Sequence, residues 1–439
     1  MKIKLAFLLL ILNVFPLSHV YSQVNKYEIT TILKEKFTDK SGSTLTGKGV
    51  VIGDVDSGID IFHPMFFFAD GGEFDWVDTD GDGRLTLGTD GVDFNKDGKV
   101  DIIETLRYIE ITDNTWEMLP GIERKKFNPE FDFLYLDKNS NKKRDYGVKD
   151  GFNENDPTYG EQLFIAIDGN RNGRLDVTEK IIALKTSKVR AVREKNGAVR
   201  RRGQDLIYTE QDSSGHGTGV AGLILGGHYG VQKNHGIAPD AEFVVASVKY
   251  DYTPRFVRNF PDLVKFLRDE KVNILLFEDG EWVWEFMDGS TEEEEIVNQC
   301  ARDGMTIIGG SGNLASSSMH IKDTLSPGEN STYTIDCPRI HAEGKLNDGV
   351  FASFLWRDAN KKLNFVIESP DKQKSSELNS GNDFIKVGKY NISYSREVSP
   401  KGTVMFKFGF SAFDSSSVEG TWKINIKTPE SIVIDGFVV

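Results

Sequence analysis

The chain has 439 residues, which is long for a single hydrophobic core and predicts two or three domains. Its net charge of −14 argues against binding to nucleic acids or to anionic membrane surfaces. The only cysteines are Cys300 and Cys337, which excludes a disulfide framework as the main source of stability.

The N-terminal residues have the pattern of a secretory signal peptide. Lys2 and Lys4 precede an apolar run, and a small-residue end follows near Ser22. The run is short for a membrane span and is interrupted by Pro16. We therefore expect residues 1–22 to be a signal peptide. The mature protein would be secreted, periplasmic or extracellular, with no membrane contact once the signal is removed.

A short polar lead-in over residues 23–45 is followed by the first buried strand. The apolar run VVIGDV predicts a parallel strand that ends at Asp56. In open α/β sheets, functional sites form at the carboxyl ends of the strands. Asp56 is therefore a candidate functional residue.

A segment of different composition, residues 67–204, separates this strand from the next α/β elements. Much of it is rich in Asp, Asn, Gly and Lys, which predicts an insertion. Near its end, residues 187–202 carry seven basic side chains. We interpret this run as a solvated loop, with a processing site as the alternative.

The α/β pattern resumes at residue 205 and continues to residue 322. The segment GHGTGVAGLILGG predicts a helix that begins at a glycine. The elements expected after it are a strand over 241–250, a helix over 260–271, a strand over 273–278, a helix that begins at a Ser290–Glu293 capping box and ends at Gly304, and a strand over 305–313.

From residue 323 the hydrophobic period changes to two. In GTVMFKFGF and GTWKINIK, apolar residues alternate with other residues. This alternation predicts an antiparallel β-sandwich as a separate domain over residues 323–439.

Two stretches of the insertion match the twelve-residue calcium-binding loop of EF-hands. We name them loop I (residues 93–104) and loop II (residues 168–179). Each offers side-chain oxygens at positions 1, 3, 5, 9 and 12, a backbone carbonyl at position 7, and glycine at position 6. The expected ligands are Asp93, Asn95, Asp97, Lys99 (carbonyl), Asp101 and Glu104 in loop I, and Asp168, Asn170, Asn172, Arg174 (carbonyl), Asp176 and Glu179 in loop II.

A third stretch starts in the same way but is incomplete, because Thr89 occupies position 12. Its candidate ligands are Asp78, Asp80 and Asp82. A stretch that begins at Asp137 lacks the glycine and is a weak match. We expect Ca²⁺ as a cofactor with a structural role, because an ion that binds only the folded state stabilises that state. The alternative for each stretch is an acidic surface turn.

His216 lies between glycines at the start of the helix that follows the insertion. A lone histidine is more often structural than catalytic. However, Gly215, Gly217 and Gly219 would allow the backbone to approach another group closely. A carboxylate such as that of Asp56 can fix a histidine tautomer and stabilise the imidazolium formed when a serine is deprotonated.

Four segments resemble, in order, motifs of the subtilisin-like serine proteases. They are GDVDSGIDIFHP (53–64), SSGHGTGVAG (213–222), GIAPDAEFVVASVK (236–249) and IIGGSGN (307–313). The resemblance implies a mostly parallel α/β sheet with helices on both faces, built from residues 46–66 and 205–322, and a polypeptide substrate.

The resemblance also implies a role for three residues. Asp56 would orient the base, His216 would be the general base and then the general acid, and the Asn313 amide would stabilise the oxyanion. We expect the three at one edge of the sheet, with an Asp56 carboxylate oxygen within hydrogen-bond reach of the His216 imidazole.

The sequence departs from the family pattern at three places. Gly219 stands where the family often has a second histidine, and LLFEDGEW (275–282) replaces the usual end of the substrate-binding strand. No Gly-Thr-Ser-x-Ala nucleophile motif occurs between Asn313 and Val439. Some subtilisin-like proteases carry an inserted β-domain between the oxyanion asparagine and the nucleophile, and the predicted β-sandwich lies at that place.

Three interpretations follow from these departures. The chain is the first part of a secreted, calcium-stabilised serine endopeptidase, or a non-catalytic subtilisin-like binding protein, or a half-enzyme completed by a second chain that carries the serine.

Overall fold

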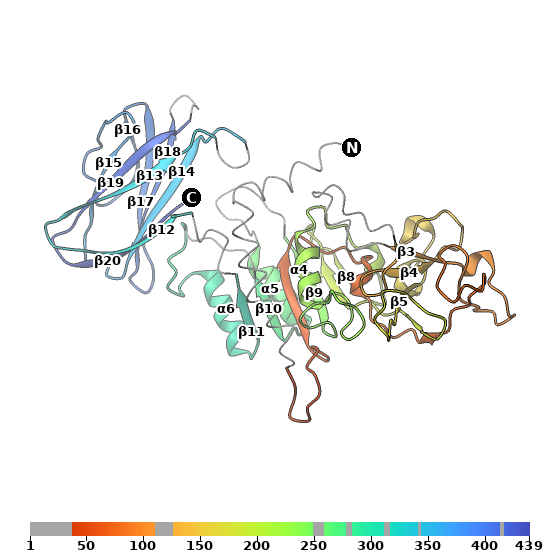
Figure 1. The fold of residues 1–439 in the computed structure, drawn as a ribbon. Coiled ribbons are helices and arrows are strands. Elements are labelled where there is room, and N and C mark those ends of the chain that lie inside the picture. The colour runs from red at the N-terminus through yellow and green to blue at the C-terminus, as the bar shows by residue number, and fades with distance from the viewer. Residues whose placement is uncertain are drawn as a thin grey trace.

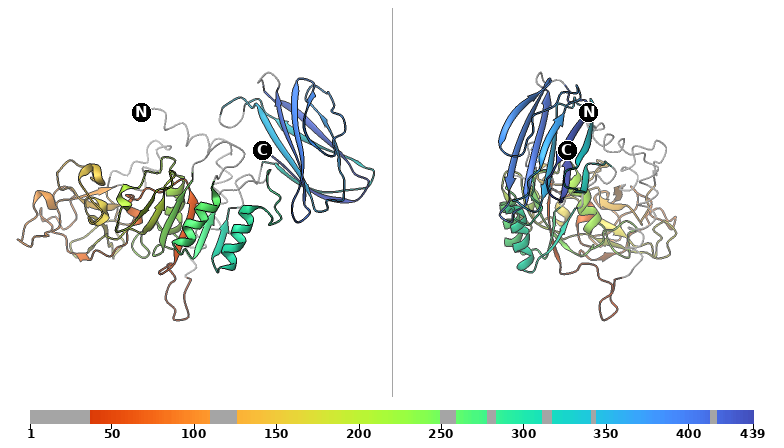
Figure 2. Two further views of the ribbon diagram at one scale, coloured as in Figure 1. Left: turned by 180° about the vertical axis from the view of Figure 1, so that it is seen from behind. Right: turned by 90° about the vertical axis from the view of Figure 1, so that its left-hand side faces the viewer.

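The structure is a computed structural model that describes residues 37–109, 126–248, 259–277, 283–310, 317–340, 344–412 and 417–439. In Figure 1 the β-sandwich lies at one end, the α/β layer in the middle, and the antiparallel sheet of the insertion at the other end. Figure 2 shows the same succession from behind. Within the described ranges, no helix combines the length and apolar character that a membrane span needs.

A six-stranded sheet forms the α/β layer. Its strand order is β11 (Thr306–Gly309), β10 (Ile274–Phe277), β1 (Val51–Asp56), β9 (Glu242–Ser247), β7 (Val189–Arg193) and β8 (Val199–Arg201). All neighbouring strands are parallel except β7 and β8. The two central strands are short apolar runs covered on both faces, as parallel strands require.

Helices cover both faces of this sheet. On one face, α5 (Phe260–Asp269) and α6 (Glu292–Arg302) bury apolar side chains against β1, β9, β10 and β11. On the other face, α4 (His216–Leu225) packs through Ala221 and Leu225. Figure 1 shows α4 beside β9, with α5 and α6 toward the sandwich. The expected α/β fold with helices on both faces is therefore confirmed.

The helix α6 begins one residue later than the sequence predicts. Its N-cap is Thr291, whose hydroxyl accepts from the Glu294 N–H while the Glu294 carboxylate accepts from the Thr291 N–H. The prediction of a Ser290–Glu293 capping box was therefore wrong by one residue. Ser290 and Glu293 are three residues apart, and so are Thr291 and Glu294. The local sequence therefore does not distinguish the two possible capping boxes.

The basic run 187–202 is not a solvated loop, so that prediction was wrong. It contains all of β7 and β8, and several of its arginines pair with acidic side chains of the α/β layer. Arg201 binds Glu270, and Arg202 binds Glu242. Because these partners lie far away in the sequence, the run by itself resembled a loop.

The insertion forms a five-stranded antiparallel sheet. Its order is β2 (Glu73–Phe74), β6 (Ile181–Ala183), β5 (Leu163–Ala166), β4 (Phe133–Leu136) and β3 (Leu106–Ile109). Loops I and II lie outside these strands. Short 3-10 helices span Pro64–Phe66, Ile102–Glu104, Val148–Asp150, Pro157–Tyr159 and Leu206–Tyr208.

The C-terminal part consists of two antiparallel sheets. One has the order β12 (His320–Leu325), β20 (Ile432–Val438), β14 (Gly349–Trp356), β18 (Val404–Ala412), β17 (Tyr390–Val398) and β16 (Asn382–Val387). The other has the order β13 (Asn330–Cys337), β19 (Gly420–Lys427) and β15 (Asn364–Glu368). Alternate apolar residues of both sheets form one core, in which Phe365 and Trp422 are fully buried.

The segment between β10 and α6 contacts the sandwich. The Asp288 carboxylate accepts a hydrogen bond of 2.6 Å from the Ser399 hydroxyl. The Lys401 ammonium donates to the carbonyls of Asp288 and Gly289, and the Arg357 guanidinium donates to the carbonyl of Met287. Polar contacts therefore join the sandwich to the α/β layer.

Candidate active site

Asp56 is the last residue of β1, a strand paired with β9 on one side and β10 on the other. The side chain is buried, and its Oδ1 accepts a hydrogen bond of 2.5 Å from the Ser57 N–H. The carboxylate therefore lies at the carboxyl end of the central strands, where open α/β sheets form their sites.

His216 is the first residue of α4 and faces Asp56 across this edge. Its Nδ1 lies 2.8 Å from each carboxylate oxygen of Asp56. The imidazole is 57% exposed, whereas Asp56 is 1% exposed. A carboxylate at this distance favours the tautomer with its proton on Nδ1, which places the lone pair on Nε2.

Asp212 links the end of β1, which carries Asp56, to the start of α4, which carries His216. One of its carboxylate oxygens accepts from the Ser57 hydroxyl at 2.9 Å. The other accepts from the Thr218 N–H at 3.0 Å and from the Thr218 hydroxyl at 2.8 Å. Burial would raise the pKa of Asp212, but the hydrogen bonds from Thr218 and Ser57 outweigh it and lower the pKa.

This network also caps α4. The N-cap residue is Gly215, which has no side chain to satisfy the first N–H groups of the helix. The N–H of Gly217 donates to the Ser57 hydroxyl at 3.0 Å, and that of Thr218 donates to Asp212. A carboxylate at a helix N-terminus is also favoured by the helix dipole. The sequence analysis did not select Ser57 or Asp212, because Asp212 lies three residues before the N-cap and Ser57 comes from a distant segment.

The C-terminal end of α4 is held by a buried lysine. The Lys188 ammonium donates to the carbonyls of Leu225 and Gly227 at 2.8 and 2.7 Å. Burial lowers its pKa to about 7, while the more distant charge of Asp240 acts in the opposite direction. Both ends of the helix that begins with His216 are therefore fixed by side chains from other elements.

Asn313 lies outside the described residues, so its position relative to His216 stays a prediction. The neighbouring strand ends are described. Val55 of β1 pairs with Phe277 of β10, which pairs with Gly309 of β11. The segment that contains Asn313 thus starts from the same sheet edge as Asp56.

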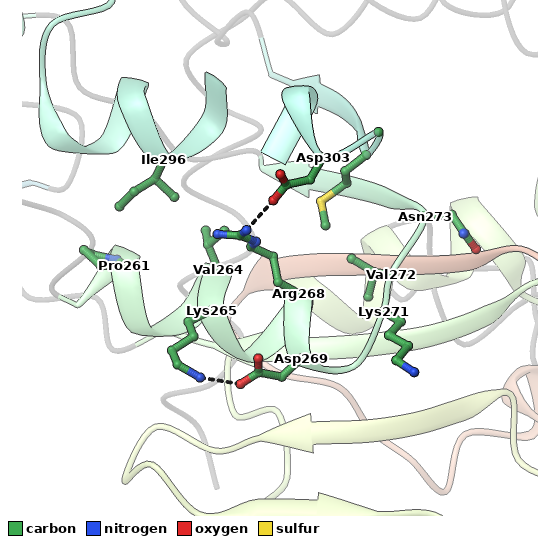
Figure 3. Close-up of a pocket in the computed structure, with 12 residues that line it drawn as sticks. Pro261, Val264, Lys265, Arg268, Asp269, Lys271, Val272, Asn273, Ile296 and Asp303 are labelled. Carbon is green, nitrogen blue, oxygen red and sulfur yellow. Dashed lines mark hydrogen bonds and ion pairs between the residues drawn. The ribbon is translucent and has the colours of Figure 1, made fainter. Parts of the chain in front are cut away.

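A pocket of about 830 Å³ lies away from this edge. Figure 3 shows its lining from α5, α6 and the residues just before β10 and β11, with an ion pair between Arg268 and Asp303. Asn273 and Met305 place it at the amino ends of the strands, on the face opposite α4. This pocket is therefore separate from the Asp56–His216 pair.

Loops I and II share one hydrogen-bond pattern. The glutamate at position 12 accepts from the N–H groups of positions 2 and 9, at 2.9 and 3.0 Å in loop I and at 2.8 and 2.9 Å in loop II. The aspartate at position 1 accepts from the N–H of position 6 at 2.8 and 2.7 Å. The side chains that could hold Ca²⁺ are therefore gathered within each loop, and carboxylate and amide oxygens are ligands that Ca²⁺ prefers.

The incomplete stretch, which we name loop III (residues 78–90), is completed by a residue outside the twelve-residue pattern. Asp90 accepts from the N–H of Thr79 at 2.8 Å and from that of Thr86 at 2.5 Å, which are positions 2 and 9. Ligand atoms of the three aspartates at positions 1, 3 and 5 lie within 4.8 Å of one another. The sequence analysis missed Asp90 because it assumed a fixed spacing.

Comparison with known proteins gives a family for the α/β region. The model of the Subtilase family matches residues 47–256, which include Asp56 and His216. A comparison with curated protein sequences gave no match. Among solved structures, the CspB protease of Clostridium perfringens is similar in fold, with a TM-score of 0.55 at 13% sequence identity. The match covers 90% of this chain and 64% of that protease.

This chain therefore spans a little under two thirds of the length of the CspB protease. At 13% identity the likeness concerns the fold, whereas the family match rests on the sequence around the two site residues. Residues 47–256, a little under half of the chain, are therefore a region of the subtilase family, and this region contains both Asp56 and His216.

Proposed function

We propose that Asp56, His216 and Asn313 are the orienting acid, the general base and the oxyanion donor of a serine-peptidase site that acts on polypeptides. The observation that supports this most directly is the distance of 2.8 Å between Nδ1 of His216 and the Asp56 carboxylate. Because the imidazole is more than half exposed, a substrate can reach it.

In this mechanism Nε2 of His216 takes the proton from a serine hydroxyl as that oxygen attacks the peptide carbonyl carbon. The Asp56 carboxylate stabilises the resulting imidazolium, and His216 then gives the proton to the leaving amine. The side-chain amide of Asn313 donates to the oxyanion. Removing such a donor typically costs about 2.7–4 kcal/mol of transition-state stabilisation.

The tautomer of His216 tests this assignment without any turnover. With ¹⁵N-labelled histidine, NMR of the chain should show the neutral ring protonated on Nδ1, and His216→Gln identifies the signal. Asp56→Asn should weaken that preference, because the carboxylate that accepts from Nδ1 is lost. A neutral wild-type ring protonated on Nε2 would contradict the proposed base.

A second candidate function is supported by the sequence. The 439 residues contain no Gly-Thr-Ser-x-Ala motif, so a non-catalytic binding role, or a serine supplied by a second chain, is the alternative. We expect a fluorophosphonate to leave this 439-residue chain unlabelled and a chromogenic peptide to give no burst. Stoichiometric labelling would show that one of its own serines is activated by His216.

We further propose that loops I, II and III bind Ca²⁺, and that the bound ions stabilise the insertion. Their carboxylate and amide oxygens would hold the ion, which would offset the repulsion between neighbouring acidic side chains. A chelator should lower the melting temperature, and Asp93→Ala or Asp168→Ala should each remove part of that effect. Equal melting with and without chelator would contradict a calcium role.

An exported location is also part of the proposal. It is supported by the signal-peptide pattern over residues 1–22, which lie outside the described part of the chain. Millimolar extracellular calcium would also fill weak sites. Expression of the chain with and without residues 1–22, followed by fractionation, tests the location directly.

A further inference from the structure

A fourth loop, residues 137–145, has the same internal pattern as loop II although its sequence lacks the glycine. We name it loop IV. In loop II the amides at positions 3 and 5 donate to the aspartate at position 9, at 2.9 and 2.7 Å. In loop IV, Asn139 and Asn141 donate in the same way to Asp145, at 2.5 and 2.8 Å. The two loops therefore arrange the same side chains in the same order.

Lysine takes the place of the glycine at position 6 of loop IV. Lys142 has a φ of +65°, close to the +77° of Gly173 at position 6 of loop II. Its N–H donates to Oδ2 of Asp137 at 3.0 Å, as the N–H of Gly173 donates to Asp168 at 2.7 Å. The left-handed conformation is unfavourable for a lysine, and Lys142 adopts it although its side chain is exposed.

The carboxylate that closes loop IV comes from a distant part of the chain. Position 12 is Val148, which is exposed and has no oxygen in its side chain. Glu161, just before β5, accepts instead from the N–H groups of positions 2 and 9, Lys138 and Asp145, at 2.7 and 3.0 Å. These are the contacts that the position-12 glutamate makes in loops I and II.

An independent observation points to a ligand for this loop. Asp137, at position 1, is 1% exposed, and within the described residues its Oδ1 is buried without a hydrogen-bond partner. The other oxygen, Oδ2, accepts from Lys142 and from the Arg107 guanidinium. An unsatisfied oxygen of a buried carboxylate is more costly than an unsatisfied neutral group, so a partner is expected. In loops I and II the equivalent Oδ1 accepts from the N–H of position 5 at 3.1 Å, toward the long end of the usual range.

The charges around loop IV leave room for a cation. Lys138, Lys142 and Lys143 are exposed, so their ammonium groups are solvated. Arg144 is turned away from the carboxylates, and its guanidinium donates to the backbone carbonyls of Phe62, Thr158 and Glu161. Asp137, Asp145 and Glu161 contribute three carboxylates to the loop and its closure, and Arg107 pairs with that of Asp137 alone.

We propose that loop IV is a further calcium site, in which Asp137, Asn139, Asn141 and the Lys143 carbonyl act together with Glu161. This inference rests on the proposal that loops of this shape bind Ca²⁺. The closing glutamate joins two strands of the insertion, and the contact from Arg144 to Phe62 joins the loop to the segment that follows Asp56. The ion would therefore fix the insertion to the candidate active site.

The test is the number of Ca²⁺ ions bound by the full chain, measured by native mass spectrometry after metal removal and titration. Glu161→Gln should bind one ion fewer than the wild type. Glu154→Gln is the matched control, because Glu154 also accepts from two backbone N–H groups of the same region but belongs to no loop. The control should keep the wild-type number.

A second variant covers the case in which Glu161→Gln does not fold. Asn139 and Asn141 are exposed, so replacing both by Ala should leave the fold intact and weaken binding of one ion at least tenfold. A wild-type ion count in either folded variant would overturn the proposal. If Asp93→Ala and Asp168→Ala also lose no ion, the general calcium assignment fails instead, which separates the two failures.

Discussion

Replacement of Gly217 by Ala tests how closely α4 approaches β1. A Cβ at this position would lie 2.2 Å from the carbonyl oxygen of Gly58 and 3.2 Å from Cβ of Asp56. Gly219, on the same helix, has no atom within 4 Å of the place where its Cβ would be. The two glycines therefore form a matched pair, in which the same substitution meets backbone at one position and open space at the other.

Gly217→Ala and Gly219→Ala should change the stability of the domain in opposite directions. To bring the new methyl group to a normal contact distance, α4 must move by roughly 1 Å. Overpacking of this kind typically costs about 1–3 kcal/mol, and the better helix propensity of Ala returns at most about 1 kcal/mol. Gly217→Ala should thus destabilise the domain by about 1–2 kcal/mol. Gly219→Ala should stabilise it by about 0.5–1 kcal/mol.

Two measurements separate this reasoning from a general loss of stability. Calorimetry should show Gly217→Ala melting below the wild type and Gly219→Ala at or above it. In ¹⁵N-histidine NMR, only Gly217→Ala should shift the His216 signals, because its methyl group pushes His216 away from Asp56. Equal melting of the two variants together with unchanged His216 signals would refute the close approach.

Three further predictions concern side chains that hold the site or join its domains. Asp212→Ala should cost about 2 kcal/mol in urea unfolding and shift the His216 NMR signals, because α4 loses its cap and its link to Ser57; an unchanged midpoint would contradict this. Lys188 has a pKa lowered to about 7 by burial, so unfolding takes up protons and the wild type should gain stability between pH 7 and pH 10 relative to Lys188→Met. Burial alone would raise the pKa of Asp288, but hydrogen bonds and the Arg357 charge lower it to about 2. Its stabilisation, present above about pH 4, should therefore be lost toward pH 2, and Asp288→Asn should melt with less acid dependence.

Local patterns in the sequence predicted the elements that carry the candidate site. The apolar run before Asp56 predicts a buried strand, and glycine followed by small and apolar residues predicts the helix that starts at His216. Both are properties of neighbouring residues, so they can be recognised without the fold. The same holds for loops I and II, in which the residues proposed as ligands fall within twelve consecutive residues.

Residues that depend on distant partners could not be selected in this way. Ser57 and Asp212 are 155 residues apart, and no pattern in either segment shows that they share a hydrogen bond. The three glycines around His216 look alike in the sequence, yet only Gly217 meets another backbone. A close approach is a property of two elements and is decided when they pack.

The sequence by itself thus determined the strand that carries Asp56, the helix that begins at His216, and the two loops with regular EF-hand spacing, because each is encoded by residues in one short segment. The tertiary structure alone decided that Asp212 caps α4 and that Asp90 and Glu161 close the two irregular loops. The physical reason is that a backbone N–H donates to any carboxylate that the fold brings within about 3 Å, whatever the distance of that carboxylate along the chain.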